Sequence, residues 1–321
     1  MRAFLVSSFE DPPRYTDVNR PDPAKGEVLI EIEACALNFA DLLMANGTYQ
    51  DTPTLPFALG MEVAGRIAAH GEGVSAPALG TRVAVFGGSG GLAEYGVFPA
   101  DLCIPLPDDI PSDIAAGLIV AYGTSHLALT RRAQLQAGET LLVLGAAGGV
   151  GLTAVELGKA IGATVIAVAR GAGKLEIARQ AGADHLIDSD IDDVKAAVKA
   201  LGGADVVYDP VGGDLFTAAL SACKPEARYI LIGFASGEVP KPRANVLLVK
   251  NITLIGFYWG GYMAFNQDAL KSSLDEIMGW YAKGRIKPHV SHHLPLEKAN
   301  EALDLLRTRK ATGKVVVTVK P

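Results

Sequence analysis

A glycine-rich turn at residues 145–151 constrains the fold of this chain more than any other stretch. Residues 140–144 form an apolar run of strand length, and the turn Gly-Ala-Ala-Gly-Gly-Val-Gly follows it directly. From Val150, apolar residues recur at helical spacing until Gly162, and residues 164–169 form a second apolar, β-branched run. A strand, a helix and a second strand within about thirty residues predict a parallel βαβ unit.

The turn itself predicts a dinucleotide-binding site. In the register G-x-G-x-x-G, Gly148 and Gly151 occupy the second and third glycine positions, and Ala146 occupies the first. Glycine lets the backbone approach a pyrophosphate, and the helix behind the turn directs its N-terminus at the negative charge. A glycine-rich turn of another α/β protein is the alternative, and the βαβ surroundings favour the dinucleotide. The expected contacts from the turn are Ala147, Gly148, Gly149 and Val150.

The end of the second strand favours NADP(H) over NAD(H). A free ribose 2′-hydroxyl usually calls for Asp or Glu about 20 residues past the glycines. Here the strand ends in Arg170, and Lys174 follows. Both residues suit a 2′-phosphate, because their side chains form charge-assisted hydrogen bonds to phosphate oxygens. The alternative interpretation is a solvated basic loop that opens the next helix.

Length, charge and cysteine content exclude several classes of protein. At 321 residues the chain suits two domains, and its net charge of −6 argues against a nucleic-acid surface. Apolar runs stay below the length of about 18 residues that spans a bilayer. Residues 1–6 run straight into a strand-like segment, without the pattern of a signal peptide. Three distant cysteines indicate a reducing compartment, so we expect a cytoplasmic protein.

The chain divides into a β-rich first third and an α/β remainder. Val28, Ile30 and Ile32 alternate with glutamates, which predicts a strand with one face in water. From about residue 112 helices alternate with apolar strands, and this order predicts a doubly wound parallel sheet. The β-branched segment 314–319 is expected to return to the β-rich part. Ligands of doubly wound sheets bind beyond the carboxyl ends of the strands.

Short motifs spread over the whole chain follow the pattern of a known family. They are Asn38-Phe39-Ala40-Asp41, Gly60-Met61-Glu62-Val63-Ala64-Gly65, the turn Ala-Ala-Gly-Gly-Val-Gly, Gly182-Ala183-Asp184, Asp209-Pro210-Val211-Gly212-Gly213 and Gly313-Lys314-Val315-Val316. With these motifs the chain resembles the zinc-independent medium-chain dehydrogenases/reductases of the quinone oxidoreductase type. The resemblance implies a GroES-like β-rich catalytic domain at 1–121 and 262–321. It also implies a Rossmann domain at 122–261, catalysis in the cleft between the domains, and a homodimer.

The same resemblance argues against zinc. Alcohol dehydrogenases of this superfamily place a zinc-binding Cys three residues before the Asp and a zinc-binding His just before the Glu. This chain has Asn38 and Met61 at those positions. Neither side chain contributes to a catalytic zinc site of three protein ligands. Without a Lewis acid, the remaining chemistry is hydride transfer to an acceptor that is already electrophilic, such as a quinone or an enone.

The resemblance also implies roles for individual residues. Asn38 and Thr124 would act in catalysis and contact the nicotinamide end of the cofactor, while Tyr49 would line the substrate mouth. Further cofactor contacts would come from Val211, Gly233, Phe234, Phe257 and Lys314. Two local alternatives stay open, because Asn38 could cap a turn and Tyr49 could be an amphipathic surface aromatic.

We therefore expect a metal-free NADPH:quinone oxidoreductase. One alternative is a reductase of enoyl or acryloyl thioesters or other activated alkenes, and another is a non-enzymatic NADPH-binding structural or interaction protein. Two further patterns predict no chemistry. Residues 87–91 match a G-x-S-x-G elbow, but a strand rather than a helix follows, so we expect a hairpin turn. His292 and His293 lack neighbouring ligands and are expected in a solvated loop.

Overall fold

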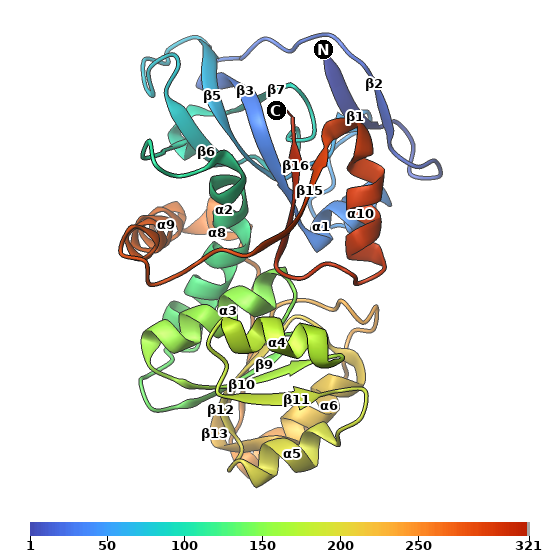
Figure 1. The fold of residues 1–321 in the computed structure, drawn as a ribbon, viewed down its shortest axis with the longest axis vertical. Helices are drawn as coiled ribbons and strands as arrows, with labels where there is room; N and C mark the ends of the chain where they lie inside the picture. The colour runs from blue at the N-terminus through green and yellow to red at the C-terminus, as the bar shows by residue number, and fades with distance from the viewer. Residues whose placement is uncertain (320–321) are drawn as a thin grey trace. The chain divides into compact units, whose positions relative to one another are not determined.

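The computed structural model describes residues 1–319, and the chain forms two compact units (Figure 1). The first unit comprises Met1–Val120 and the chain from Pro288 onward, and the second comprises Ala121–Lys287. Residues 262–287, which the sequence analysis assigned to the β-rich domain, thus belong to the second unit. The packing explains this difference, because His126 contacts both Ser273 and Trp280 of that segment.

The first unit is built mainly from β-strands. Its larger sheet has the order β15-β16-β3-β5-β6-β8, with β7 also paired to β3, and β2-β1-β4 form a smaller sheet. The strands are β1 (Arg2–Val6), β2 (Arg14–Asp17), β3 (Glu27–Leu37), β4 (Phe57–Ala58), β5 (Glu62–His70), β6 (Arg82–Phe86), β7 (Tyr95–Pro99), β8 (Ile104–Pro105), β15 (Val290–Pro295) and β16 (Lys314–Thr318). The helices are α1 (Phe39–Ala45), η1 (Ala100–Leu102), η3 (Leu296–Lys298), α10 (Ala299–Arg307) and the first part of α2 (Ser112–His126).

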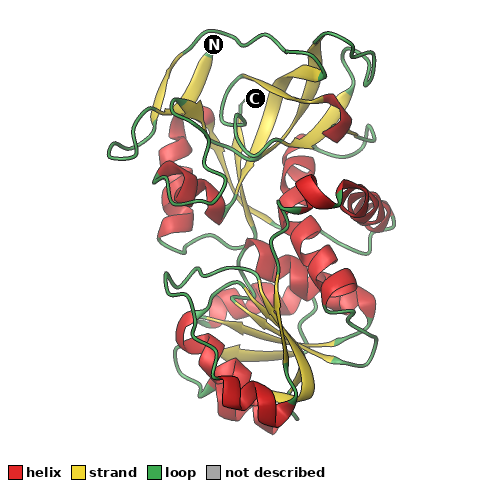
Figure 2. Ribbon diagram, turned by 180° about the vertical axis from the view of Figure 1, so that it is seen from behind, coloured by secondary structure: helices red, strands yellow, loops and turns green. Residues whose placement is uncertain are grey.

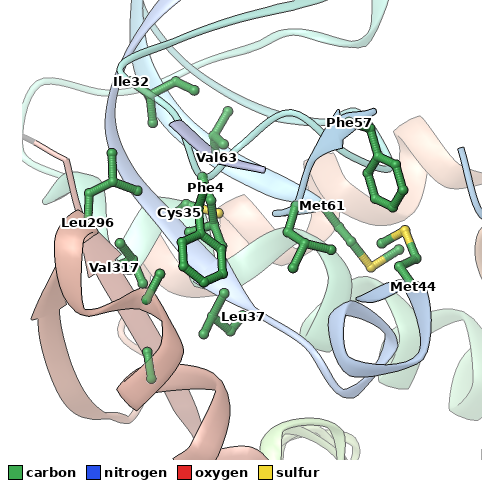
Figure 3. Packing of buried hydrophobic residues seen from close by; sticks show 14 of the residues in the cluster. Phe4, Ile32, Cys35, Leu37, Met44, Phe57, Met61, Val63, Leu296 and Val317 are labelled. Atoms are coloured by element: carbon green, nitrogen blue, oxygen red, sulfur yellow. The ribbon is translucent and has the colours of Figure 1, made fainter. Parts of the chain in front are cut away.

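Strand β3 is central to this unit. It pairs antiparallel with β16 on one side and with β5 on the other. The pairing with β16 confirms the prediction that the last strand returns to the β-rich part of the chain. Its apolar side chains enter a core that also draws on α10 and β16, and Figure 3 shows Phe4, Ile32, Leu296 and Val317 converging there. Burying one such side chain stabilises the fold by about 1.5–3 kcal/mol. This packing, together with the strand pairing, holds the ends of β16, β3 and β5 in fixed register.

The second unit is a doubly wound α/β sheet. All its strand pairs are parallel, in the order β11-β10-β9-β12-β13-β14. Its strands are β9 (Thr140–Leu144), β10 (Thr164–Ala169), β11 (His185–Asp188), β12 (Ala204–Asp209), β13 (Cys223–Leu231) and β14 (Thr253–Gly256). Its helices are α3 (Gly149–Ile161), α4 (Ala172–Gln180), α5 (Val194–Ala200), α6 (Gly213–Ala222), α7 (Ala244–Lys250), α8 (Tyr262–Phe265), α9 (Gln267–Ala282) and the π-helical segment η2 (Leu127–Arg132).

This strand order positions a ligand site. Helices lie on both sides of the sheet in Figure 2, which explains the continuous apolar runs of β9 and β10. The order of the strands reverses between β9 and β12, as in the Rossmann fold, and such folds bind ligands at that point beyond the carboxyl ends of the strands. The glycine-rich turn follows β9 directly.

Two local predictions were wrong. Residues 87–91 do not close a hairpin, because β6 pairs with β5 and β8 whereas β7 pairs with β3. His292 and His293 lie on β15 rather than in a loop, because β16 pairs with this edge strand in parallel. Among residues 1–319, helices long and apolar enough to span a bilayer are absent.

Candidate functional site

The glycine turn has the geometry of a phosphate-binding turn. Gly145 has a φ of +61°, and its carbonyl oxygen accepts the N–H of Gly148 at 2.9 Å. A methyl group at Gly151 would lie 2.2 Å from that same oxygen, so only glycine fits at this position. Helix α3 begins at Gly149, and within residues 1–319 no side chain caps its N-terminus. Its first N–H groups therefore fit the pyrophosphate of a dinucleotide.

Alanine at the first glycine position is accommodated by burial. Ala146 is fully buried, and its N–H donates to the carbonyl of Val168 on β10 at 2.9 Å. The methyl group thus faces the protein interior, and the peptide links the turn to the neighbouring strand. The departure from the glycine pattern leaves the turn intact.

A buried hydroxyl cluster supports the first turn of α3. Ser125 Oγ donates to the carbonyl of Val150 at 2.9 Å, and it lies 2.7 Å from Thr153 Oγ1 and 2.9 Å from Tyr208 Oη. Together these side chains connect α2 and β12 to helix α3. Sequence reasoning missed all three, because single hydroxyl residues on separate elements carry no motif. Thr124, the neighbour of Ser125, is also buried on α2.

The loop after β12 contacts the glycine turn on one side and the loop after β13 on the other. The Val211 side chain lies 2.9 Å from the position of a methyl group at Gly145. The Phe234 ring lies 3.3 Å from the place that a methyl group at Gly212 would occupy. The N–H of Gly233 donates to the Asp209 carbonyl at 3.3 Å. Three segments named by the sequence analysis thus come together at one edge of the sheet. Phe257 is buried farther along the sheet, where its N–H donates to the Leu231 carbonyl.

Asp209 holds the loop that carries Val211. Its Oδ1 accepts the N–H groups of Val211 and Gly212, both at 2.8 Å, and its Oδ2 accepts the hydroxyl of Tyr229 at 2.7 Å. Burial raises the pKa of this carboxyl, while the three donors oppose the shift. The contacts fix the loop against the glycine turn.

The basic pair lies at the end of β10 and the start of α4. The Arg170 side chain is 57% exposed, and its Nε lies 3.9 Å from a carboxylate oxygen of Asp190, a loose surface contact. The carboxylate of Asp188, at the end of β11, accepts the N–H of Gly171 at 3.0 Å. The N–H groups of Gly171 and Asp190 hold the pKa of Asp188 below its usual range. These two carboxylates were not predicted from the sequence, because they lie at and just after the end of the next strand, β11. Lys174 is half-buried on α4.

In the first unit, a buried polar cluster surrounds Asn38. Lys314 Nζ donates to the Leu37 carbonyl, to Asn38 Oδ1 and to Glu62 Oε1, each at 2.8 Å. Asn38 Nδ2 donates to Glu62 Oε1 at 2.9 Å. Glu62 is fully buried and Lys314 is nearly so. The sequence analysis named Asn38 and Lys314 but gave Glu62 no role.

Asp41 lies beside this cluster at the start of α1. Its carboxylate accepts the N–H of Asn38 at 2.7 Å and the N–H of Gly60 at 3.1 Å. Burial raises the pKa of the Asp41 carboxyl to about 7. The backbone N–H of Asn38 thus takes part in capping α1, while the Asn38 side chain contacts Glu62 and Lys314. Tyr49 is half-buried after α1 and packs against the core of the unit.

The donor set around Asn38 does not resemble a metal site. Met61 is buried in the apolar core shown in Figure 3. Over residues 1–319, no three His, Cys, Asp or Glu side chains gather where they could hold a metal ion. The amide of Asn38 accepts from the Lys314 ammonium and donates to the Glu62 carboxylate, and these two charged groups pair with each other.

Comparisons with known proteins cover nearly the whole chain. Residues 24–108 match the family described as alcohol dehydrogenase GroES-like domain, and residues 149–275 match the family described as zinc-binding dehydrogenase. The chain is 39% identical over 300 residues to the quinone oxidoreductase-like protein 2 homolog of Nematostella vectensis, covering 92% of this chain and 82% of that protein. These matches confirm the predicted combination of a GroES-like and a Rossmann domain.

Solved structures give the same result. A mycobacterial protein in complex with NADPH has a TM-score of 0.93 and 31% identity, over 99% of this chain and 100% of that one. The Escherichia coli quinone oxidoreductase in complex with NADPH has a TM-score of 0.91 and 28% identity, again over 99% of this chain and 100% of that one. The similarity thus extends over both units of the fold.

Proposed function

The chain belongs to the quinone oxidoreductase family of medium-chain dehydrogenases/reductases, and from this premise we propose that it is an NADPH-dependent, metal-free quinone reductase. The observation that carries the proposal is the glycine turn, in which a Cβ at Gly151 would lie 2.2 Å from the Gly145 carbonyl. A turn this tight presents the uncapped N-terminus of α3 to a pyrophosphate. Both solved relatives described above are complexes with NADPH.

The second unit would bind and orient the cofactor. The backbone of residues 147–150 would hold the pyrophosphate, and Arg170 with Lys174 would bind the 2′-phosphate through charge-assisted hydrogen bonds. Val211 meets the glycine turn, and Gly233 and Phe234 lie against the loop that carries Val211, which supports their role as further contacts. Phe257 and Thr124 are assigned to the nicotinamide end through the family resemblance. NADPH, when bound, supplies the hydride.

The first unit would bind the acceptor. Asn38 Nδ2 carries two hydrogens, of which one is donated to Glu62 at 2.9 Å. Among residues 1–319 the other has only the Ala36 carbonyl at 3.5 Å, which is the limit for a hydrogen bond. We assign this hydrogen to the carbonyl oxygen of the acceptor, where it would stabilise the negative charge that develops on reduction. Tyr49 would line the mouth of the same site.

The residues around Asn38 support a mechanism without zinc. A catalytic zinc site needs three protein ligands such as Cys, His or a carboxylate. Asn38 and Met61 stand where zinc-dependent relatives have two of them, and the nearby Glu62 is already paired with Lys314. A quinone is electrophilic without a Lewis acid, so a hydrogen-bond donor suffices to polarise its oxygen.

We also propose a cytoplasmic homodimer that associates through the second unit. The edge strand β14 and the side chains of Leu248 and Val249, each 76% exposed on α7, support this assignment. Analytical ultracentrifugation at micromolar concentration should give about twice the chain mass of 33.5 kDa.

A single panel tests the activity. Binding of NADPH is measured by fluorescence, and NADPH oxidation is followed with quinones, enones and enoyl thioesters. Preferred turnover of quinones supports the proposal, whereas preferred turnover of enoyl thioesters would identify the chain as an alkene reductase. Tight NADPH binding without turnover of any acceptor would favour a non-enzymatic binding protein. Absence of NADPH binding would overturn the proposal as a whole.

A further inference from the structure

All three N–H donors of the Lys314 ammonium group are used by acceptors within the protein. An ammonium group has three N–H donors, and here they reach the Leu37 carbonyl, Asn38 Oδ1 and Glu62 Oε1, each at 2.8 Å. The side chain is only 5% exposed, and its stem packs against Gly117 of α2. No donor is left over for a ligand, so a direct ionic contact with the cofactor does not fit this residue.

Glu62 has equally complete contacts. Its Oε1 accepts from both Lys314 Nζ and Asn38 Nδ2, and its Oε2 accepts the N–H of Val120 at 2.8 Å. The side chain is fully buried. It therefore links the Asn38 amide, the Lys314 ammonium and helix α2 in one fixed arrangement.

The ion pair dictates which way the Asn38 amide points. The cation faces Oδ1 and the carboxylate faces Nδ2. A flip of the amide would place its NH2 group against an ammonium and its oxygen against a carboxylate, and both new contacts would be repulsive inside the protein. Both partners thus favour one orientation.

Strand register brings the three residues together. Lys314 begins β16, Glu62 begins β5, and Asn38 follows the last residue of β3. Because β3 lies between β16 and β5, with Leu37 opposite Val315 and Ala36 opposite Glu62, these strand ends are neighbours in the sheet. The paired strands of the sheet therefore hold the arrangement.

We propose that Lys314 and Glu62 are positioning residues, whose ion pair fixes the Asn38 amide so that its second Nδ2 hydrogen is presented to the acceptor oxygen. The inference rests on the proposed function for its acceptor, and it gives Lys314 a task different from cofactor contact. An amide that could flip would present its oxygen to the acceptor for part of the time. Catalysis would then fall while cofactor binding is retained.

The test replaces the pair by neutral groups of similar size. In the double variant Lys314→Met with Glu62→Gln, neither partner leaves an unpaired buried charge. The single variant Glu62→Gln keeps the cation and provides a second measurement if the double variant does not fold. The matched control is Lys224→Met with Asp205→Asn, which removes the 2.7 Å ion pair of the second unit.

The first readout uses the whole chain without cofactor. Asparagine side chains are labelled with ¹⁵N, and the Asn38 signals are identified by their loss in Asn38→Asp. In the wild type we expect the Asn38 amide proton shifts to lie far from those of exposed asparagines, because a cation and a carboxylate flank the group. In both variants the shifts should move toward those of exposed asparagines, because the amide then also adopts the flipped orientation about its Cβ–Cγ bond. The control should leave these signals unchanged. Asn38 signals that are identical in the wild type and in the folded variants would overturn the inference.

The second readout is steady-state kinetics with NADPH and the best quinone. We expect kcat to fall roughly 10- to 100-fold in the double variant, with the Kd for NADPH within about twofold of the wild type. Unchanged kcat in a folded double variant would contradict the positioning role. Absence of turnover in the wild type would contradict the proposed function alone, because the amide signals need no acceptor.

Discussion

Tyr122 donates its phenolic hydroxyl to the carboxylate of Glu156, which connects α2 to helix α3 behind the glycine turn. The other carboxylate oxygen of Glu156 accepts the N–H of Lys287 at 3.0 Å. Tyr122 lies two residues after Val120, where the first unit ends, and Lys287 is the last residue of the second unit. One carboxylate on α3 therefore holds both chain segments by which the second unit begins and ends.

This relationship predicts a loss of stability in Glu156→Gln. Glutamine can still accept the Lys287 N–H through its oxygen, but it then presents an NH2 group to the Tyr122 hydroxyl, so a neutral hydrogen bond of reversed direction replaces the charge-assisted one. We expect the free energy of unfolding to fall by about 1–3 kcal/mol, measured by urea denaturation. Tyr122→Phe should cost a similar amount, and the double variant less than the sum of the two. Additive losses would show that the two side chains act independently.

The close packing of Gly151 in the glycine turn predicts that alanine at this position weakens NADPH binding, whereas alanine at a glycine of another helix does not. In Gly151→Ala the new methyl group would lie 2.2 Å from the Gly145 carbonyl, so the turn or α3 must shift. We expect the Kd for NADPH to rise at least about tenfold, because the N–H groups of the helix start are displaced. Gly279→Ala is the matched control. It lies on α9 with open space around its Cβ, and it should leave NADPH binding unchanged.

The basic pair predicts the choice between cofactors. In Arg170→Ala with Lys174→Ala, the KM for NADPH should rise by about tenfold, while the KM for NADH changes little. The reason is that only NADPH carries the 2′-phosphate. Lys199→Ala, an exposed lysine on α5, controls for the loss of surface charge. Equal changes in the two KM values would assign Arg170 and Lys174 to a solvated loop.

The meeting of neighbouring loops at one edge of the parallel sheet could be predicted from sequence. Parallel strands that follow one another through helices end at the same edge of a sheet, so the contacts of Val211 with Gly145 and of Gly233 with Asp209 follow from the order of the elements. The strand β15 could not be predicted in this way. Its polar His292 and His293 lack apolar alternation, and only pairing with β16 makes the segment a strand.

The contacts of Asn38 could not be predicted for a different reason. Glu62 and Lys314 are 252 residues apart, and their contact depends on the register of strands β5, β3 and β16. A one-residue slip in either pairing would turn one of these side chains to the other face of the sheet. The motifs marked the positions, but only the paired strands show that the two charges meet.

Asp41 predicts a specific pH dependence of stability. Burial raises the pKa of this carboxyl from 3.8 to about 7, so the folded state holds the proton more tightly than the unfolded state. The contribution of Asp41 to stability is therefore complete below pH 3.8 and is lost as the pH rises toward 7.

Chemical denaturation at several pH values tests this prediction. Asp41→Asn cannot titrate, so the stability difference between wild type and variant should shrink as the pH rises through that window, by at most about 1.4 kcal/mol per pH unit. Asp188→Asn provides the opposite case. The pKa of Asp188 is lowered, so its contribution is present at neutral pH and is lost on acidification. A constant difference for Asp41→Asn would show that its carboxyl titrates normally.

The final prediction concerns the amide that would contact the acceptor. Asn38→Ala removes the donor but leaves the Asp41 carboxylate bound to the backbone N–H of residue 38. We expect kcat with quinones to fall about 100-fold, as for the loss of one preorganised donor to a developing oxyanion. The Kd for NADPH should change far less, because the turn that we propose for the pyrophosphate belongs to the other unit. Asn46→Ala, exposed at the end of α1, should leave both constants unchanged. If Asn38→Ala instead weakens NADPH binding and spares kcat, Asn38 acts on the cofactor rather than on the acceptor.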